Sequence, residues 1–130
     1  MNILIAEDDA SSRVYLYATL RLHGEIHIAN DGDEAVDCFA TALERHNPYD
    51  LVCLDIVMPA MDGHEALRRM RDMEQQCGTD SSHGAKIIMT TSVGSIHDVA
   101  AAYRALCDGY LAKPFDRRAI IQELKRLELL

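Results

Sequence analysis

The feature that most constrains the fold of this chain is the alternation of short apolar runs with longer segments of helical periodicity. Five runs have the length and composition of strands: Asn2 to Ala6, Ile26 to Ala29, Leu51 to Leu54, Lys86 to Thr90 and Tyr110 to Ala112. Most are apolar without strict alternation, which is typical of strands covered by helices on both faces. Apolar residues recur at helical spacing between them and after the last. The pattern predicts an α/β fold in which crossover helices join parallel strands.

Five helices are expected between and after these strands. The first spans roughly Ser11 to Leu22, where apolar residues are too frequent to define one buried face. The others have apolar positions that start at Ala35, Ala66, Ile96 and Ile120. Strict alternation of five strands and five helices within 130 residues predicts a three-layer α/β/α sandwich. The polar segment Gln75 to Gly84 is expected to be a surface loop.

Composition limits the classes of function. The chain has 13 basic and 21 acidic residues, a formal net charge of −8, which argues against direct binding to nucleic acid. Its apolar runs are too short to span a membrane, and acidic residues from Glu7 onward interrupt any secretion signal. Four cysteines without a Cys-x-x-Cys pair fit reduced thiols. We therefore expect one cytoplasmic domain over residues 1–130, with neither membrane nor nucleic acid as a partner.

Polar residues gather at the carboxyl ends of the expected strands, where open parallel sheets bind ligands. Glu7, Asp8 and Asp9 follow the first strand, and Asp55 follows the third. Thr91 and Lys113 follow the fourth and fifth. Clustered carboxylates require a cation, and hard oxygen ligands suit Mg²⁺. The pattern predicts a magnesium site with Asp55 as a nucleophile toward phosphorus, and with Thr91 and Lys113 as ligands of the phosphoryl oxygens.

Several polar residues have a simpler structural interpretation. Asp9, Asp31 and Asp62 are expected to cap helices or form turns. Thr90 is expected to be structural, because it points away from Thr91 in an alternating strand. Three arginines of the third helix are expected to form a solvated face: Arg68, Arg69 and Arg71. The first turn lacks the glycine patterns that cradle dinucleotides or nucleoside triphosphates.

Taken together, these motifs resemble the receiver domains of response regulators in two-component signalling, in particular stand-alone chemotaxis-regulator (CheY-like) receivers. The resemblance covers nearly the whole chain. It depends on four segments: Ile3 to Asp9, Asp50 to Pro59 with Met61-Asp62-Gly63, Thr91-Ser92, and Tyr110 to Phe115. It implies a flavodoxin-like sheet with strand order 2-1-3-4-5.

The resemblance also implies a role for each matching residue. Asp55 is the expected phospho-acceptor, Thr91 and Lys113 bind the phosphoryl group, and Thr91 with Tyr110 forms the switch. Magnesium would be held by four residues, with Glu7 acting through water and Val57 through its carbonyl: Glu7, Asp8, Asp55 and Val57. The Lys113-Pro114 bond is expected to be cis.

The implied function is a phosphorylation-activated switch that catalyses only its own phosphorylation and dephosphorylation. A histidine kinase or phosphotransfer protein would donate the phosphoryl group. The signal would leave through the fourth helix, fifth strand and fifth helix to a downstream protein target, and a dimer on phosphorylation is compatible with the family. Since nearly the whole chain matches the receiver pattern, no residues are expected to remain for a separate output domain.

Three positions depart from the commonest receiver pattern: Val57, Val93 and Leu106, which stands where a Gly is frequent before the fifth strand. Val57 and Val93 are apolar where the family's hydrolytic water passes, so neither side chain can orient that water. We expect the phosphoryl group to be comparatively long-lived. An unchanged dephosphorylation rate in the Val57→Asn, Val93→Glu double variant would contradict this hypothesis.

Two alternatives of other classes remain at this stage. A magnesium-dependent phosphohydrolase of the haloacid-dehalogenase type also uses an aspartyl nucleophile, but it needs a second Asp where this chain has Val57. A degenerate receiver that acts only as an interaction module is disfavoured by the presence of Asp8, Asp55, Thr91 and Lys113.

Overall fold

The computed structural model describes residues 1–79, 83–92 and 106–130 of the chain. In chain order the elements are β1 (Asn2–Ala6), α1 (Ala10–Leu20), β2 (Glu25–Ala29), α2 (Gly32–Glu44), β3 (Leu51–Asp55), α3 (Gly63–Gln76), β4 (Lys86–Ser92), β5 (Gly109–Lys113) and α5 (Arg117–Arg126). The expected helix around Ile96, and Val93, lie outside the described residues. None of the helices in these three stretches is long and apolar enough to cross a bilayer.

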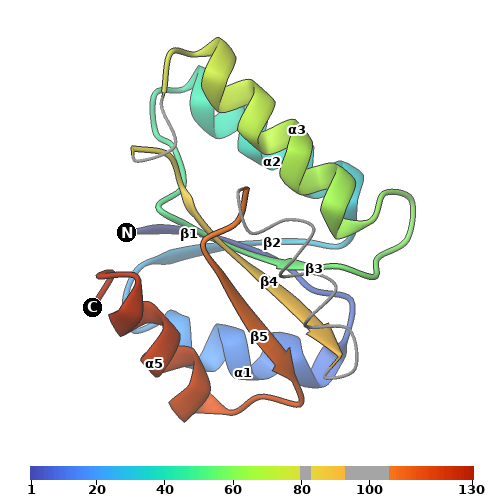
Figure 1. Cartoon of the computed structure of the whole chain (residues 1–130), viewed down its shortest axis with the longest axis vertical. Helices are drawn as coiled ribbons and strands as arrows, with labels where there is room; N and C mark the ends of the chain where they lie inside the picture. The colour runs from blue at the N-terminus through green and yellow to red at the C-terminus, as the bar shows by residue number, and fades with distance from the viewer. Residues whose placement is uncertain (80–82, 93–105) are drawn as a thin grey trace.

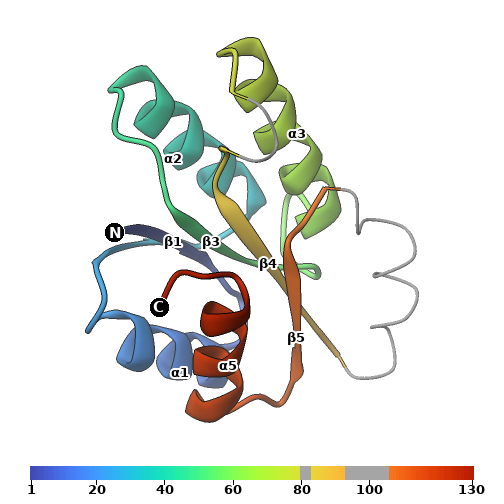
Figure 2. The same ribbon diagram turned by 60° about the vertical axis from the view of Figure 1, so that its left-hand side comes forward.

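The five strands form one parallel sheet in the order β2-β1-β3-β4-β5. This order and the three layers confirm the fold predicted from the sequence. Helices α2 and α3 cover one face of the sheet, and α1 and α5 cover the other (Figures 1 and 2). The carboxyl ends of β1, β3, β4 and β5 therefore lie next to one another along one edge of the sheet.

Alternate residues of each strand supply two separate cores. Leu4, Val52 and Leu54 pack toward α2 and α3, together with Phe39 and Met70 from those helices. Ile3, Ile5 and Cys53 pack toward α1 and α5, together with Leu16 and Leu124. Since the central strands are buried on both faces, they need no polar alternation, which explains their uniformly apolar sequence.

Aspartates cap every described helix. The side chains of Asp9, Asp31, Asp62 and Asp116 each accept a hydrogen bond from the backbone N–H three residues later. This confirms the capping interpretation of Asp9, Asp31 and Asp62, and Asp116 was not anticipated. Each cap satisfies a backbone donor that the first helical turn leaves without a partner.

Several sequence predictions need correction. Strand β4 continues to Ser92, so Thr91 lies within the strand and not after it. Asp55 and Lys113 are likewise the last residues of β3 and β5 and do not follow them. Gln75 belongs to α3, because the helix ends only at Gln76. The prediction of a solvated face holds for Arg68 and Arg69 but is wrong for Arg71, whose side chain is only 12% exposed.

The Arg71 side chain is largely, though not fully, buried because its guanidinium group joins three separate parts of the chain. It donates hydrogen bonds to the Leu106 carbonyl at 2.7 Å and the Ala85 carbonyl at 2.9 Å. It also bonds the carboxylates of Glu74 at 2.7 Å and Asp108 at 2.8 Å. These four partners compensate the charge of the guanidinium group. The periodicity of the helix alone cannot reveal such contacts with distant segments.

Candidate functional site

Glu7, Asp55 and Lys113 come together at the carboxyl ends of three strands. The Lys113 Nζ atom lies 2.5 Å from Glu7 Oε1 and 3.0 Å from Asp55 Oδ2. Glu7 is 1% exposed and Asp55 is 3% exposed. The structure therefore brings two buried carboxylates together around one ammonium group. This agrees with the prediction that residues at the carboxyl ends of neighbouring strands gather at one edge of the sheet.

The Asp55 carboxylate has a fixed orientation. Its Oδ1 atom accepts a hydrogen bond from the Val57 backbone N–H at 3.1 Å, and its Oδ2 atom accepts one from the Asp8 backbone N–H at 3.4 Å. The Lys113 ammonium is a further donor to Oδ2, so both oxygens of the carboxylate have a partner. The side chain is held where β3 ends and does not swing freely.

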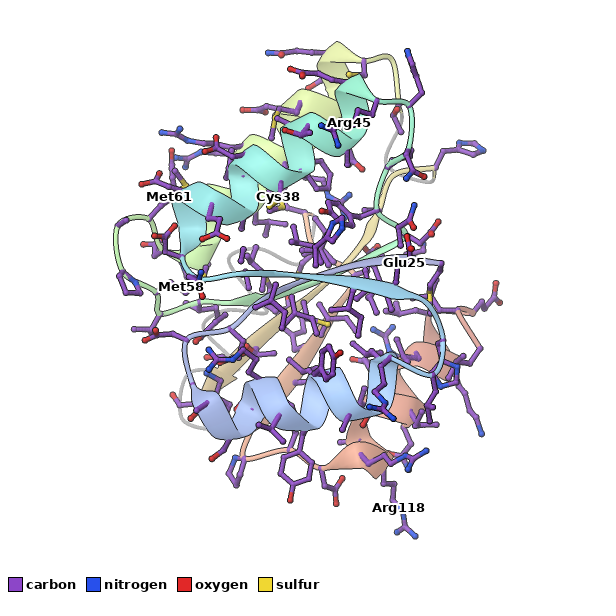
Figure 3. All side chains as sticks on the ribbon, turned by 180° about the vertical axis from the view of Figure 1, so that it is seen from behind. Glu25, Cys38, Arg45, Met58, Met61 and Arg118 are labelled. Carbon is purple, nitrogen blue, oxygen red and sulfur yellow. The ribbon has the colours of Figure 1, made fainter. Side chains whose placement is uncertain are left out.

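The loop after Asp55 is held from both sides. The Ile56 N–H donates to the Thr90 carbonyl at 3.1 Å, and the Gly63 N–H donates to the Ile56 carbonyl at 2.8 Å. A Cβ atom at Gly63 would lie 2.3 Å from the Asp55 carbonyl oxygen, so only glycine allows this close approach. Met58 and Met61 anchor the loop in the core beside α2 and α3 (Figure 3).

Glu7 has three donors around its buried carboxylate. Besides Lys113, the Thr90 hydroxyl donates to Oε2 at 2.5 Å and the Asp9 N–H donates to Oε1 at 3.3 Å. Burial and the neighbouring Asp55 raise the pKa of Glu7 to about 7, against the opposing effects of Lys113 and Thr90. Burial by itself would lower the pKa of Lys113. The bonds to Glu7 and Asp55 together have the larger effect, so the pKa of Lys113 is raised.

Thr90 is the site residue that the sequence reasoning missed. The sequence predicts a structural role for Thr90 on the face away from Thr91, and its fully buried hydroxyl donates to Glu7, so that role includes holding a carboxylate of this cluster. The register places Thr90 beside Asp55, at the same level of the sheet. A signal that could have found it is the need of a buried carboxylate such as Glu7 for hydroxyl or amide donors.

Of the remaining predicted site residues, Asp8 and Val57 contact this cluster through the backbone N–H groups that donate to Asp55. Thr91 is buried and pairs in register with Ala112, but its hydroxyl makes no hydrogen bond to any described residue. Asp8 is exposed, and the Val57 side chain is 78% exposed. Tyr110 is half-buried with a buried hydroxyl oxygen. The Lys113-Pro114 peptide bond is cis, as predicted.

The chemistry of these donors fits a hard divalent cation. Glu7, Asp8 and Asp55 offer carboxylate oxygens. Above the pKa of Glu7, the single charge of Lys113 leaves the two buried carboxylates with one uncompensated negative charge. Within the described residues, no three His, Cys, Asp or Glu side chains converge into a ready-made metal site. The ammonium group of Lys113 supplies the positive charge between Glu7 and Asp55 in this arrangement.

Comparison with known proteins points to one family. The family model described as "Response regulator receiver domain" matches residues 3–125. The chemotaxis protein CheY of Halobacterium salinarum is 32% identical over 124 residues, which cover 94% of this chain and 92% of that protein. A probable histidine kinase 2 of Oryza sativa is 33% identical over 132 residues, which cover 94% of this chain. The matched region is only 12% of that kinase, so the chain corresponds to a small part of it.

Solved structures share the fold over nearly the whole chain. The CheX–CheY–BeF3–Mg complex from Borrelia burgdorferi contains a chain with a TM-score of 0.79 and 27% identity, with coverage of 98% of this chain and 89% of that chain. A co-crystal structure from Saccharomyces cerevisiae joins the phosphotransfer protein Ypd1 with the receiver domain of Ssk1. That match has a TM-score of 0.77 and 28% identity, with coverage of 96% and 86%.

Proposed function

Because this chain belongs to the response regulator receiver domain family of two-component signalling, we propose that it is a switch controlled by phosphorylation of Asp55. The observation that carries the proposal is the position of the Asp55 carboxylate. It lies at the end of β3, fixed by two backbone N–H groups and 3.0 Å from the ammonium of Lys113. A carboxylate oriented in this way can serve as a nucleophile toward phosphorus.

The proposed reaction transfers one phosphoryl group. An oxygen of Asp55 attacks the phosphorus of a phosphohistidine, the P–N bond breaks, and the imidazole leaves with the electron pair and takes up a proton. The product is an aspartyl phosphate on Asp55. Attack by water later releases inorganic phosphate and restores the carboxylate, so the chain acts only on its own phosphoryl group.

Lys113 and Thr91 are proposed to bind the transferred group. The ammonium of Lys113 already contacts the acceptor carboxylate, so it can neutralise charge that develops on a phosphoryl oxygen. Thr91 lies in β4, beside the strand that ends with Lys113. We propose that its hydroxyl turns to the phosphoryl group and that Tyr110 responds, which together form the switch.

Glu7, Asp8 and Asp55, with the carbonyl of Val57, are the residues proposed to hold Mg²⁺, Glu7 through water. When bound, the ion screens the negative charges of carboxylate and phosphoryl oxygens. The uncompensated charge beside Lys113 and the exposed Asp8 support this assignment. The magnesium named with the similar Borrelia burgdorferi complex is consistent with it.

The proposed partners are a histidine kinase or phosphotransfer protein as donor and a downstream protein as target. The similarity to the receiver domain that was crystallised with Ypd1 supports a phosphotransfer donor. The output face would include β5 and α5, whereas its fourth helix lies outside the described residues. A dimer on phosphorylation stays a prediction. The free cysteines are consistent with the proposed cytoplasmic location.

The test is incubation with Mg²⁺ and acetyl phosphate, followed by intact mass spectrometry. We expect one phosphoryl group per chain in the wild type and none in Asp55→Asn. Labelling should be normal in the matched control Asp33→Asn, at an exposed position of α2. Repeated turnover of a phosphomonoester would instead indicate a hydrolase. A chain that is not modified under these conditions, nor altered by beryllofluoride, would contradict the switch.

A further inference from the structure

The edge of the sheet away from β5 holds a cavity of about 310 Å³ between β2 and α2. None of Glu7, Asp55 and Lys113 lines it, so it is separate from the proposed phosphorylation site. Strand β2 is an edge strand, with β1 as its neighbour on one side only. His27 pairs in register with Leu4, which packs toward α2 and α3, and therefore His27 faces this cavity.

The inner wall of the cavity is aromatic and rigid. Tyr49 is only 5% exposed, and its ring stacks on Phe39 with centroids 6.3 Å apart. The His27 ring meets Tyr49 edge-on at 5.7 Å, and His27 Nδ1 lies 2.7 Å from the Tyr49 hydroxyl oxygen. The half-buried Cys38 and Ala42 line the side formed by α2. These side chains offer apolar and π surface to a ligand.

The rim of the cavity is predominantly acidic. Three carboxylates and one guanidinium line it, a balance of −2 with His27 neutral: Glu25, Glu34, Asp37 and Arg45. The Asn30 N–H and side-chain amide both bind Glu34 at 3.2 Å. The Asp37 side chain, by contrast, makes no hydrogen bond or ion pair to any described residue. Figure 3 looks onto this edge, with Glu25 on β2, Cys38 on α2 and Arg45 directly after the end of α2.

We propose that this cavity binds a small organic cation with an apolar body. Its volume lies at the lower end of the range for small-molecule sites, about 300–1,000 Å³. The ammonium group would pair with Asp37 at the rim, while the apolar body packs against Tyr49 and Ala42. The negative surroundings also act on Cys38, whose pKa is raised by burial and by the charges of Glu34 and Asp37.

The test uses 2-phenylethylamine as probe and 3-phenylpropionate, which carries the same ring and the opposite charge, as control. Amide chemical shifts are followed by two-dimensional NMR at constant ionic strength. We expect saturable shifts around Tyr49, Cys38 and Ala42 with the amine and none with the acid. Asp37→Asn should weaken binding about two- to fivefold, as for the loss of a partly exposed ion pair.

Two further variants separate the cavity from general electrostatic attraction. Thr41→Trp places a large side chain at an exposed position that lines the cavity and should abolish the shifts while the spectrum stays folded. Glu44→Gln, on the same helix but not among the lining residues, should leave affinity unchanged. Equal binding of the acid, binding that survives Thr41→Trp, or shifts seen only with a lysine-containing peptide would overturn the proposal.

Discussion

Replacement of Arg71 by alanine tests how strongly one buried ion network holds α3 to β4 and to the start of β5. The wild-type guanidinium donates four hydrogen bonds, two of them to carboxylates. In Arg71→Ala the Glu74 carboxylate, whose side chain is 5% exposed, keeps the Ala85 N–H at 2.7 Å as its donor. A buried charge without its counter-charge is the costly outcome of such a truncation.

The magnitude follows from these contacts. Breaking a buried ion pair costs roughly 3–5 kcal/mol, and the 12% exposure of Arg71 lets water recover part of it, so we expect about 2–4 kcal/mol. An unfolding entropy of about 2.1 cal/mol/K per residue gives roughly 270 cal/mol/K for 130 residues, so Tm should fall by about 7–15 °C. Urea denaturation and calorimetry measure both quantities.

The matched control lies one turn earlier on the same helix. Arg68 pairs with Glu65 but is 60% exposed, so Arg68→Ala should change the free energy of unfolding by less than about 0.5 kcal/mol. The loss of unfolding free energy in Arg71→Lys should lie between the losses in Arg71→Ala and Arg68→Ala. One ammonium group cannot replace a planar guanidinium that reaches four acceptors. If Arg71→Ala and Arg68→Ala destabilise equally, the network does not contribute as argued.

Three further predictions concern other parts of the molecule. At pH 8 a thiol reagent should label the exposed Cys77 rapidly and Cys53 only after unfolding. Burial of Cys53 raises its pKa to about 12 and leaves almost no thiolate to react. Equal labelling rates for the two thiols would refute this. Gly63→Ala should destabilise the fold by about 1–3 kcal/mol, since its Cβ would collide with the Asp55 carbonyl oxygen. An unchanged midpoint of urea denaturation would show that the loop can move to accept the Cβ atom. Lys113→Met should tighten Mg²⁺ binding, measured by titration calorimetry, because it removes the ammonium between Glu7 and Asp55; weaker binding would mean that Lys113 organises the ligands.

The sequence predicted the residues whose positions depend on strand ends. Asp55 and Lys113 each follow an apolar run, and parallel strands must bring such ends to one edge of the sheet. The helix caps Asp9, Asp31 and Asp62 could likewise be predicted, because an aspartate directly before a helix commonly caps it. These are local patterns, so no knowledge of side-chain contacts was needed.

Contacts between distant segments could not be predicted in this way. Arg71 looks like its exposed neighbours on α3 until Ala85, Leu106 and Asp108 are placed around it. The contact of Thr90 with Glu7 could not be predicted, because strand alternation says nothing of a buried carboxylate at the end of β1, which β3 separates from β4. The cavity between β2 and α2 depends on how far one helix covers an edge strand, which hydrophobic periodicity does not encode.

Asp55 is the proposed acceptor of the phosphoryl group, and the function proposed for this chain depends on that position. The most direct measurement is to phosphorylate the chain with Mg²⁺ and acetyl phosphate, reduce the acyl phosphate with borohydride, and locate the modified residue by peptide mass spectrometry. If Asp55 is the acceptor, homoserine appears at position 55 alone, with Asp8 and Asp9 unchanged. Modification at Asp8, Asp9 or any other carboxylate while Asp55 stays intact would contradict it.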